Sequence, residues 1–467
     1  MKSQRIIPLG RAVWIMVALL ATARFLHASD NVVVITLEEA VFRAMGLNNR
    51  VRASEFALKK AAWERGNAWT QLLPAISFNT RVTRIDDQSF AERDFRRYLP
   101  PELADQIPQT VFQRSYFTSF DATVPVFNGF LLNNLRLSRA GYQMAGYLSK
   151  STRENIVYQV VRTYLDVLKG QEIRDLQEDY LELSRRNYEK AVRMEQAGRY
   201  SRTEMLRWKV DYQQQKSILA GSQSALRSHQ TMLYSLLNMD MEMTVRVEGQ
   251  IPQWLSDEAA RVSAMKDDEI LEMIALSDIR LTQRNAALAA AGAGMTTSKL
   301  AYQGQYASFM PNVTASYSYG WRENNTIELD DYSPTMLMVN VSIPVFTSFQ
   351  NTTAVKASYY AYRESVENFQ DQLKNTRFMM TDAANRLINL KIQRELSRAN
   401  AEYSANNYRI AEQQKEKGLV SNIEFIDAKL NWQDARLLEI STDYDFISTL
   451  IELYYLLGRL ESLIDHS

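Results

Sequence analysis

The stretch KGLVSNIEFI at residues 417–426 has the pattern of a tight turn followed by the start of a helix. Gly418 is typical of a residue that ends a helix, and Ser421 followed three residues later by Glu424 is typical of a helix start. The stretch AGRYSRTEML at residues 197–206 has the same Gly-x-x-Ser-x-x-Glu order, 220 positions earlier. The presence of the same turn twice, so far apart, raises the question of whether the repeat is wider than the turn.

The match between the two parts of the chain extends well beyond the turn. LYSLLN at 233–238 matches LYYLLG at 453–458, again with an offset of 220. Upstream, VPVFNGF at 124–130 matches IPVFTSF at 343–349, with an offset of 219. The landmarks keep the same order in both halves. The sequence therefore indicates an internal duplication.

The N-terminus indicates an exported chain. Positively charged residues precede an apolar run at 12–21, which is too short to cross a bilayer. This pattern is typical of a secretory signal peptide cut after Ala23 or Ala28, and a buried or anchoring helix is the alternative. No later segment has the length and hydropathy of a transmembrane helix. The expected segments are a signal peptide at 1–29, a first repeat at 30–248, a linker or belt segment at 249–266, and a second repeat at 267–467.

The composition excludes several function classes. The 467 residues include 54 Lys and Arg and 54 Asp and Glu, so no general attraction to nucleic acid is expected. There is no Cys and there are three His, of which only His229 lies away from the two ends. Thiol chemistry and disulfides are excluded, and no nucleophile–base set, phosphate-binding loop or metal cluster is visible. We expect neither an enzyme nor a cofactor.

Apolar and polar residues alternate with period two in four segments, which predicts two strands in each repeat. Each run is roughly ten residues, the length that a tilted strand needs to cross a bilayer. A soluble β-sandwich is the alternative, but four isolated strands in a mostly helical chain make a poor sandwich. We therefore favour membrane strands. The expected strands lie at about 75–84, 117–127, 311–322 and 334–346.

Long helices are expected elsewhere. About 70 residues at 129–197, and again at 348–417, contain no Pro and few Gly. Each stretch predicts two stacked helices or one bent helix, which the Gly turn joins to a second long helix running back. On the last helix, residues from Ile426 to Tyr454 keep a heptad spacing, which requires a partner helix.

Four strands cannot close a barrel, and open strand edges cannot lie in lipid, so several chains would have to share one barrel. With these features the chain resembles the TolC-like outer-membrane efflux protein family. The resemblance is carried by ITLEEAVFRAMGLNN at 35–49, LLPAISF at 72–78, the two PVF motifs and the two turns. It implies a mainly α fold with long antiparallel hairpins in an α-barrel, four strands per chain, an internal two-fold repeat and a trimeric twelve-stranded membrane β-barrel.

The resemblance also implies a function and a location. The chain would be the passive exit duct of a tripartite efflux pump or a type I secretion system, gated at its periplasmic helical tips. It would form a homotrimer in the lipid of a Gram-negative-type outer membrane, with a large periplasmic part. Its partners would be a periplasmic adaptor and an inner-membrane transporter. A non-conducting periplasmic coiled-coil scaffold, anchored in the outer membrane, is the alternative.

The resemblance places the two turns at the periplasmic tips. The positions that match the family's acidic constriction are Glu424 and Asp427, which share a helix face because they are three residues apart. Three chains would form two carboxylate rings that favour cations. Helix capping is the alternative role for Glu424, and Asp427 lies too far along the helix to cap. The expected turn and capping residues are Gly198, Ser201, Glu204, Gly418 and Ser421.

Two further observations concern motifs. Some family members have an Arg and an aromatic residue that help to lock the closed state, where this chain has Val420 and Lys415. Any lock must therefore use other residues. The expected strand-to-helix motif consists of Pro125, Phe127, Pro344 and Phe346.

Overall fold

The computed structural model describes residues 33–239, 245–276, 278–323 and 335–460. The expected signal peptide lies outside these residues. The chain divides into two compact units, each built from both sequence repeats. We call them the helical unit (Met1–Val51, Arg153–Ala275 and Met380–Ser467) and the sheet unit (Arg52–Thr152 and Leu276–Met379).

Two very long helices contribute residues to both units. They are α6 (Gly129–Gln196, 68 residues) and α12 (Gln350–Glu416, 67 residues). Each is one uninterrupted helix, so the alternative of two stacked helices is wrong. Neither helix contains Pro and α12 contains no Gly, so nothing in the sequence interrupts the hydrogen-bond ladder. At 1.5 Å per residue each helix is about 100 Å long.

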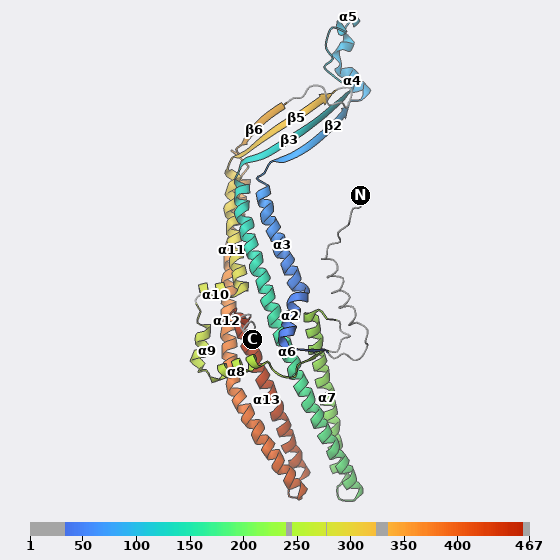
Figure 1. Cartoon of the computed structure of the whole chain (residues 1–467), viewed down its shortest axis with the longest axis vertical. Helices are drawn as coiled ribbons and strands as arrows, with labels where there is room; N and C mark the ends of the chain where they lie inside the picture. Colours follow the sequence, from blue (N-terminus) through green and yellow to red (C-terminus); the bar gives the residue numbers. More distant parts are fainter. Residues whose placement is uncertain (1–32, 240–244, 277, 324–334, 461–467) are drawn as a thin grey trace, which may run out of the picture. The chain divides into compact units, whose positions relative to one another are not determined.

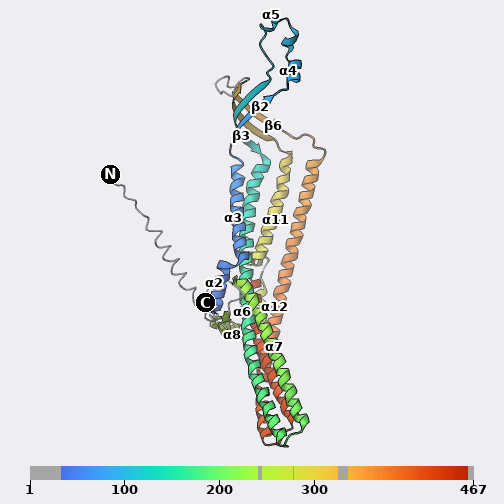
Figure 2. The same ribbon diagram turned by 90° about the vertical axis from the view of Figure 1, so that its right-hand side faces the viewer.

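In the helical unit both long helices turn back into antiparallel partners. α6 is followed by α7 (Arg202–Leu237), and α12 is followed by α13 (Asn422–Leu456). Figures 1 and 2 show the two hairpins, each closed by a short turn. The smaller elements of this unit are β1 (Val33–Ile35), α2 (Leu37–Leu47), β4 (Val245–Val247), α8 (Gln253–Ala264) and α9 (Asp267–Ile274).

The apolar core of the helical unit lies between these helices. Tyr164 of α6 is 1% exposed, and its hydroxyl donates to the carbonyl of Ile35 at 3.1 Å, which fixes the short parallel pair β1–β4 beside the bundle. On α13, Ile440, Ile447 and Ile451 are buried. These three belong to the heptad pattern of the sequence, and the partner that the pattern requires is the rest of this bundle.

The sheet unit contains all four expected strands: β2 (Ala75–Arg84), β3 (Arg114–Asn128), β5 (Asn312–Glu323) and β6 (Thr335–Ser342). They form an antiparallel sheet in the order β2-β3-β5-β6, so that β3 and β5 join the two repeats. The other elements are α3 (Asn49–Thr70), α4 (Asp87–Arg93), η1 (Phe95–Tyr98), α5 (Pro101–Ala104), α10 (Asp278–Arg284), α11 (Ala286–Gln305) and η2 (Tyr306–Phe309).

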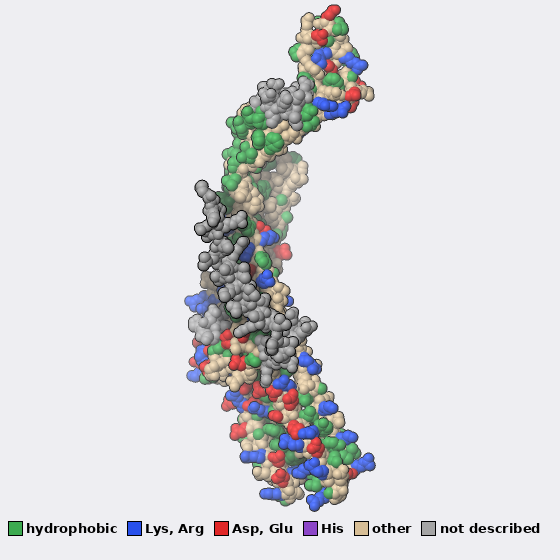
Figure 3. Space-filling view, turned by 45° about the vertical axis from the view of Figure 1, so that its right-hand side comes forward, with side chains coloured by type: hydrophobic (Ala, Val, Ile, Leu, Met, Phe, Trp, Pro, Cys, Tyr) green, Lys and Arg blue, Asp and Glu red, His purple; other side chains and the backbone are tan. Residues whose placement is uncertain are grey.

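The register of the sheet separates an apolar face from a polar face. Phe78 lies opposite Phe120, and Phe120 lies opposite Tyr319, so one apolar row crosses three strands. The rings of Phe78 and Phe120 are 4.9 Å apart. Leu337 and Val339 on β6 continue this face and are 73% and 61% exposed. Figure 3 shows hydrophobic side chains gathered over the sheet, whereas Lys, Arg, Asp and Glu are mixed over the hairpins.

The opposite face carries a hydrogen-bonded carboxylate. Asp121 on β3 accepts hydrogen bonds from Asn79 on β2 at 2.7 Å, from Ser119 at 2.7 Å and from Ser318 on β5 at 2.5 Å. Because the donors come from three strands, this cluster fixes the register on the polar side as the aromatic row does on the other.

The two PVF motifs lie in different local structures. Pro125 and Phe127 are inside β3, at a register shift against β5, where Pro does not need to donate to the ladder. The second motif differs from the expected strand 334–346, because β6 ends at Ser342 and both Pro344 and Phe346 lie in the connection to α12. Ser348 and Phe349 have positive φ angles there, of 50° and 65°.

Candidate functional site

The two repeated turns form the tips of the two hairpins. At the end of α6, Gly198 has a φ of 73°, the N–H of Arg199 donates to the carbonyl of Met194 at 2.8 Å, and the N–H of Gly198 donates to Glu195 at 2.9 Å. This pair of bonds satisfies the last carbonyls of the helix, and the left-handed backbone favours glycine. Gly418 has a φ of 71° and ends α12 in the same way.

Each returning helix begins with a capping box. The N–H of Glu204 donates to Ser201 Oγ at 3.2 Å, and the N–H of Ser201 donates to Glu204 Oε2 at 2.9 Å. Ser421 and Glu424 repeat both bonds at the same distances. The backbone N–H of each Ser stabilises the charged carboxylate, which lowers the pKa of Glu204 and of Glu424. The carboxylate of Glu424 therefore caps the start of α13.

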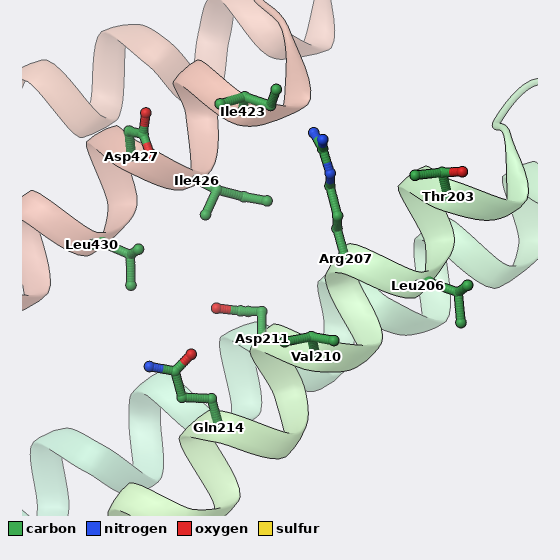
Figure 4. Close-up of a pocket in the computed structure, with 10 residues that line it drawn as sticks. All are labelled: Thr203, Leu206, Arg207, Val210, Asp211, Gln214, Ile423, Ile426, Asp427 and Leu430. Atoms are coloured by element: carbon green, nitrogen blue, oxygen red, sulfur yellow. The ribbon is translucent and has the colours of Figure 1, made fainter.

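Asp427 lies one turn further along α13 and is exposed. It lines a groove between α7 and α13 with a volume of about 460 Å³. Figure 4 shows Asp427 on the α13 wall and Arg207 on the α7 wall, with apolar side chains between them. The facing walls are built from equivalent positions of the two repeats, 220 residues apart: Leu206 with Ile426, Arg207 with Asp427, and Val210 with Leu430.

Polar contacts join α7 of the first hairpin to α13 of the second. Asn422 Nδ2 donates to Glu204 Oε1 at 2.6 Å, and Gln215 Nε2 donates to Gln433 Oε1 at 3.3 Å. In both contacts the partners are 218 residues apart. The contact residues recur along each helix at coiled-coil intervals, so the two hairpins meet along a seam with polar residues at positions that are usually apolar.

A buried ion pair lies on the same seam. Lys429 Nζ of α13 donates to Asp211 Oδ1 and Oδ2 of α7 at 2.7 and 2.6 Å, and to Ser184 Oγ of α6 at 3.0 Å. The side chains of Lys429 and Asp211 are 0% and 8% exposed. Burial lowers the pKa of Lys429, and the charge of Asp211 opposes that effect. All three N–H donors of the ammonium group are satisfied, as a buried lysine requires.

Aromatic packing surrounds this polar seam. Tyr408 of α12 stacks on Trp432 of α13 with ring centres 4.7 Å apart, and Trp208 of α7 lies 6.0 Å from Phe425. Trp208, Tyr408 and Phe425 are buried in one cluster. The apolar contacts of the tip are thus concentrated on the side of α7 and α13 that faces α6 and α12, while the groove opens away from it.

The structure supplies contacts that the sequence patterns did not identify. Where a family lock would use other residue types, the ammonium of Lys415 lies 5.7 Å from the ring centre of Tyr200, and Val420 is half-buried. The hydrogen bonds between the hairpins are made by Asn422, Lys429 and Gln433. Their only sequence signal is a polar residue at a seam position of a long helix.

The part of the chain that the structure describes has neither a metal-binding cluster nor a helix that could span a membrane. No group of three or more His, Asp or Glu side chains is placed there to hold a metal ion. No helix in the described ranges combines the length and the apolar character needed to cross a membrane.

The chain is similar to known outer membrane proteins in sequence over its second repeat and in fold over most of its length. The family model of the outer membrane efflux proteins matches residues 280–459. None of the curated proteins compared with the chain matches it. The CmeC outer membrane channel of Campylobacter jejuni is similar in structure, with a TM-score of 0.78, 14% identity, and coverage of 91% of this chain and 86% of that one.

Two other solved structures are similar over comparable lengths. VceC, an outer membrane protein of Vibrio cholerae, has a TM-score of 0.75 and 13% identity, and the match covers 90% of this chain and 96% of that one. The MtrE outer membrane channel of Neisseria gonorrhoeae, in its open state, has a TM-score of 0.72 and 15% identity, with coverage of 91% and 89%. The family match over the second repeat and the fold of the whole chain thus confirm the resemblance to the TolC-like outer-membrane efflux proteins.

Proposed function

We propose that the chain is the exit channel of an efflux system in the outer membrane of a Gram-negative-type bacterium, and that it works as a homotrimer. The observation that carries the proposal is the four-stranded sheet. Its apolar face is exposed, and within the described residues β2 pairs only with β3 and β6 only with β5. Two unpaired edges beside an apolar face are unstable in lipid and prone to aggregation in water.

Assembly of three chains removes both problems. The edge β6 of one chain would pair with the edge β2 of the next, and three copies of four strands would make a closed barrel of twelve. The apolar face, with Ile76 and Leu337 75% and 73% exposed, would then contact lipid, and the face with Asp121 would line the lumen. Closure of this kind satisfies every edge hydrogen bond.

The helical hairpins would form the periplasmic part of the duct and its gate. We assign the closed state to the seam between α7 and α13, held by Asn422 with Glu204 and by Lys429 with Asp211. Polar seam contacts can be exchanged for contacts with water when helices part, which an apolar seam cannot do. A periplasmic adaptor and an inner-membrane transporter would supply the force that separates the tips. The partners could belong to an efflux pump or to a type I secretion system.

Asp427 is the better of the two candidates for the constriction. Its carboxylate is exposed on the groove, whereas that of Glu424 accepts the N–H of Ser421 at 2.9 Å. Three copies of Asp427 would bring three carboxylates together near the tips. The segment at 1–29 would direct export to the periplasm before its removal.

The experiment that tests this function measures ion conductance and oligomeric mass on one purified sample in planar bilayers. We expect trimers that open small channels. A detergent-stable trimer that passes no ions over many insertions would support the non-conducting scaffold. As a matched control for the barrel, an Asn340→Arg variant on the polar face should still form trimers, whereas Val339→Arg on the apolar face should not.

A further inference from the structure

The groove at the tip contains charges of both signs. Arg207 and Asp427 occupy equivalent positions of the two repeats, and both line the groove from opposite walls. Asp211 also lines it, but its carboxylate is bound by Lys429 at 2.6 Å. The groove therefore contains one positive and one negative side chain beside a neutralised pair. The two repeats have diverged in the sign of charge at a position where their backbones are alike.

We infer that Arg207 is a selectivity-determining residue of the channel, because it cancels the field of Asp427 at the constriction. The inference rests on the proposed function. If Asp427 lines the lumen, the rest of the groove does so too, since its residues form one continuous surface. Each protomer would then contribute zero net charge at this level. The constriction would be an apolar collar with paired charges and not an acidic ring.

The size of the groove decides how strongly the charges of Arg207 and Asp427 act on an ion inside it. A space of about 460 Å³ is about 10 Å across if it is equally wide in every direction, and this is close to the Debye length at physiological salt. An ion inside the groove therefore experiences both side chains. In water without added salt, one unit charge at about 10 Å changes the local concentration of a monovalent ion by about twofold. Three copies in a trimer would add to this effect.

The apolar residues between the charges indicate what could pass such a collar. Leu206 and Val210 are 44% and 65% exposed on α7, and Ile423 is 51% exposed on α13. A surface of this kind contacts uncharged or zwitterionic amphiphilic compounds without the desolvation cost that an unbalanced charge would add.

The test measures reversal potentials of single trimers across a KCl gradient. We expect Arg207→Gln to raise the ratio of potassium to chloride permeability by at least about twofold, and Asp427→Asn to lower it by a similar factor. The double variant should return close to the wild-type ratio. Arg207→Lys keeps the charge and should leave the ratio unchanged. Lys209→Gln, an equal loss of charge on an exposed α7 residue outside the groove, is the matched control.

Two results would overturn the inference, and they have different meanings. Conducting trimers in which Arg207→Gln has the wild-type ratio would contradict the role of Arg207 and leave the channel function standing. A wild-type trimer of correct mass that passes no ions would contradict the proposed function itself, and the selectivity role with it. Loss of the trimer in the variant is detected by mass on the same sample, and Arg207→Lys then still tests whether the charge sets the ratio.

Discussion

Removal of the buried ammonium group of Lys429 should open the channel. In the Lys429→Met variant a side chain of similar length replaces the lysine, but Asp211 stays 8% exposed and loses the cation that binds it. Removing one member of a buried ion pair costs about 3–5 kcal/mol, because the remaining charge stays desolvated. Parting of α7 and α13 would bring the Asp211 carboxylate into water and relieve this cost. The variant therefore destabilises the closed tip more than the open one.

The free-energy cost of the unpaired Asp211 carboxylate also sets the size of the effect on channel opening. If the whole cost of about 3–5 kcal/mol is relieved on opening, the ratio of open to closed channels rises by a factor between about 100 and several thousand. Single-channel recordings should show this as a large rise in the open time of the Lys429→Met trimer. The Asp211→Asn/Lys429→Met double variant leaves no buried charge on the seam, so it should close again.

Two controls make the reasoning refutable. Lys216→Met removes the charge of an exposed lysine on α7 and should behave as wild type. Trimer mass and helix content of every variant are measured first, so that unfolding is not mistaken for opening. A Lys429→Met trimer that opens no more than wild type would refute the role of the ion pair in closure. A double variant that stays as open as the single one would refute the argument from the unpaired carboxylate.

Three further predictions concern the caps and the sheet. Ser421→Ala should cost about 1 kcal/mol at the start of α13 and speed amide hydrogen exchange in its first turn, whereas Ser421→Asp should not. The pKa values of Glu204 and Glu424 lie below the ordinary 4.5, so both caps stabilise the tips above that pH and lose this effect as the pH falls through the lowered values. The protection of the amides at both helix starts, relative to their intrinsic exchange rate at each pH, should therefore fall on acidification, and Gln at both positions should remove the dependence. Val339→Arg places a charge on the apolar face of β6 and should cost about 2–4 kcal/mol near the middle of a bilayer, measured as loss of trimers from outer membranes, while Asn340→Arg should be tolerated.

The fold was largely predictable because its signals are local and repeated. The alternation after Pro74 and Pro311 identified strands, and the observed register places Phe78, Phe120 and Tyr319 in one row, as that alternation requires. The repeat also identified both turns. The continuity of α6 and α12 was harder to predict, because the absence of Pro and the small number of Gly residues show that a helix can continue without showing that it does.

The hairpin contacts were not predictable for a different reason. Lys429 has the sequence environment of many exposed lysines, and its burial depends on Asp211, which lies 218 residues away and is not its repeat equivalent. The residue equivalent to Asp427 is Arg207, but the sequence does not reveal that both face one groove. Such pairs are set by how two helices pack, and a single sequence contains no measure of that packing.

The joint between β3 and β5 has a consequence for how the chain reaches its native state. It pairs Phe120 of the first repeat with Tyr319 of the second, which lie 199 positions apart in the sequence. The strand pair β2–β3 is therefore complete long before its neighbour β5 has been synthesised. Closing so long a loop is slow, so the strand pair β2–β3 is an apolar ribbon with free edges until β5 has paired with β3. If the chain inserts in a membrane as proposed, this ribbon would have to be shielded until then, and the rate of insertion would depend on that shielding more than on the speed of helix formation.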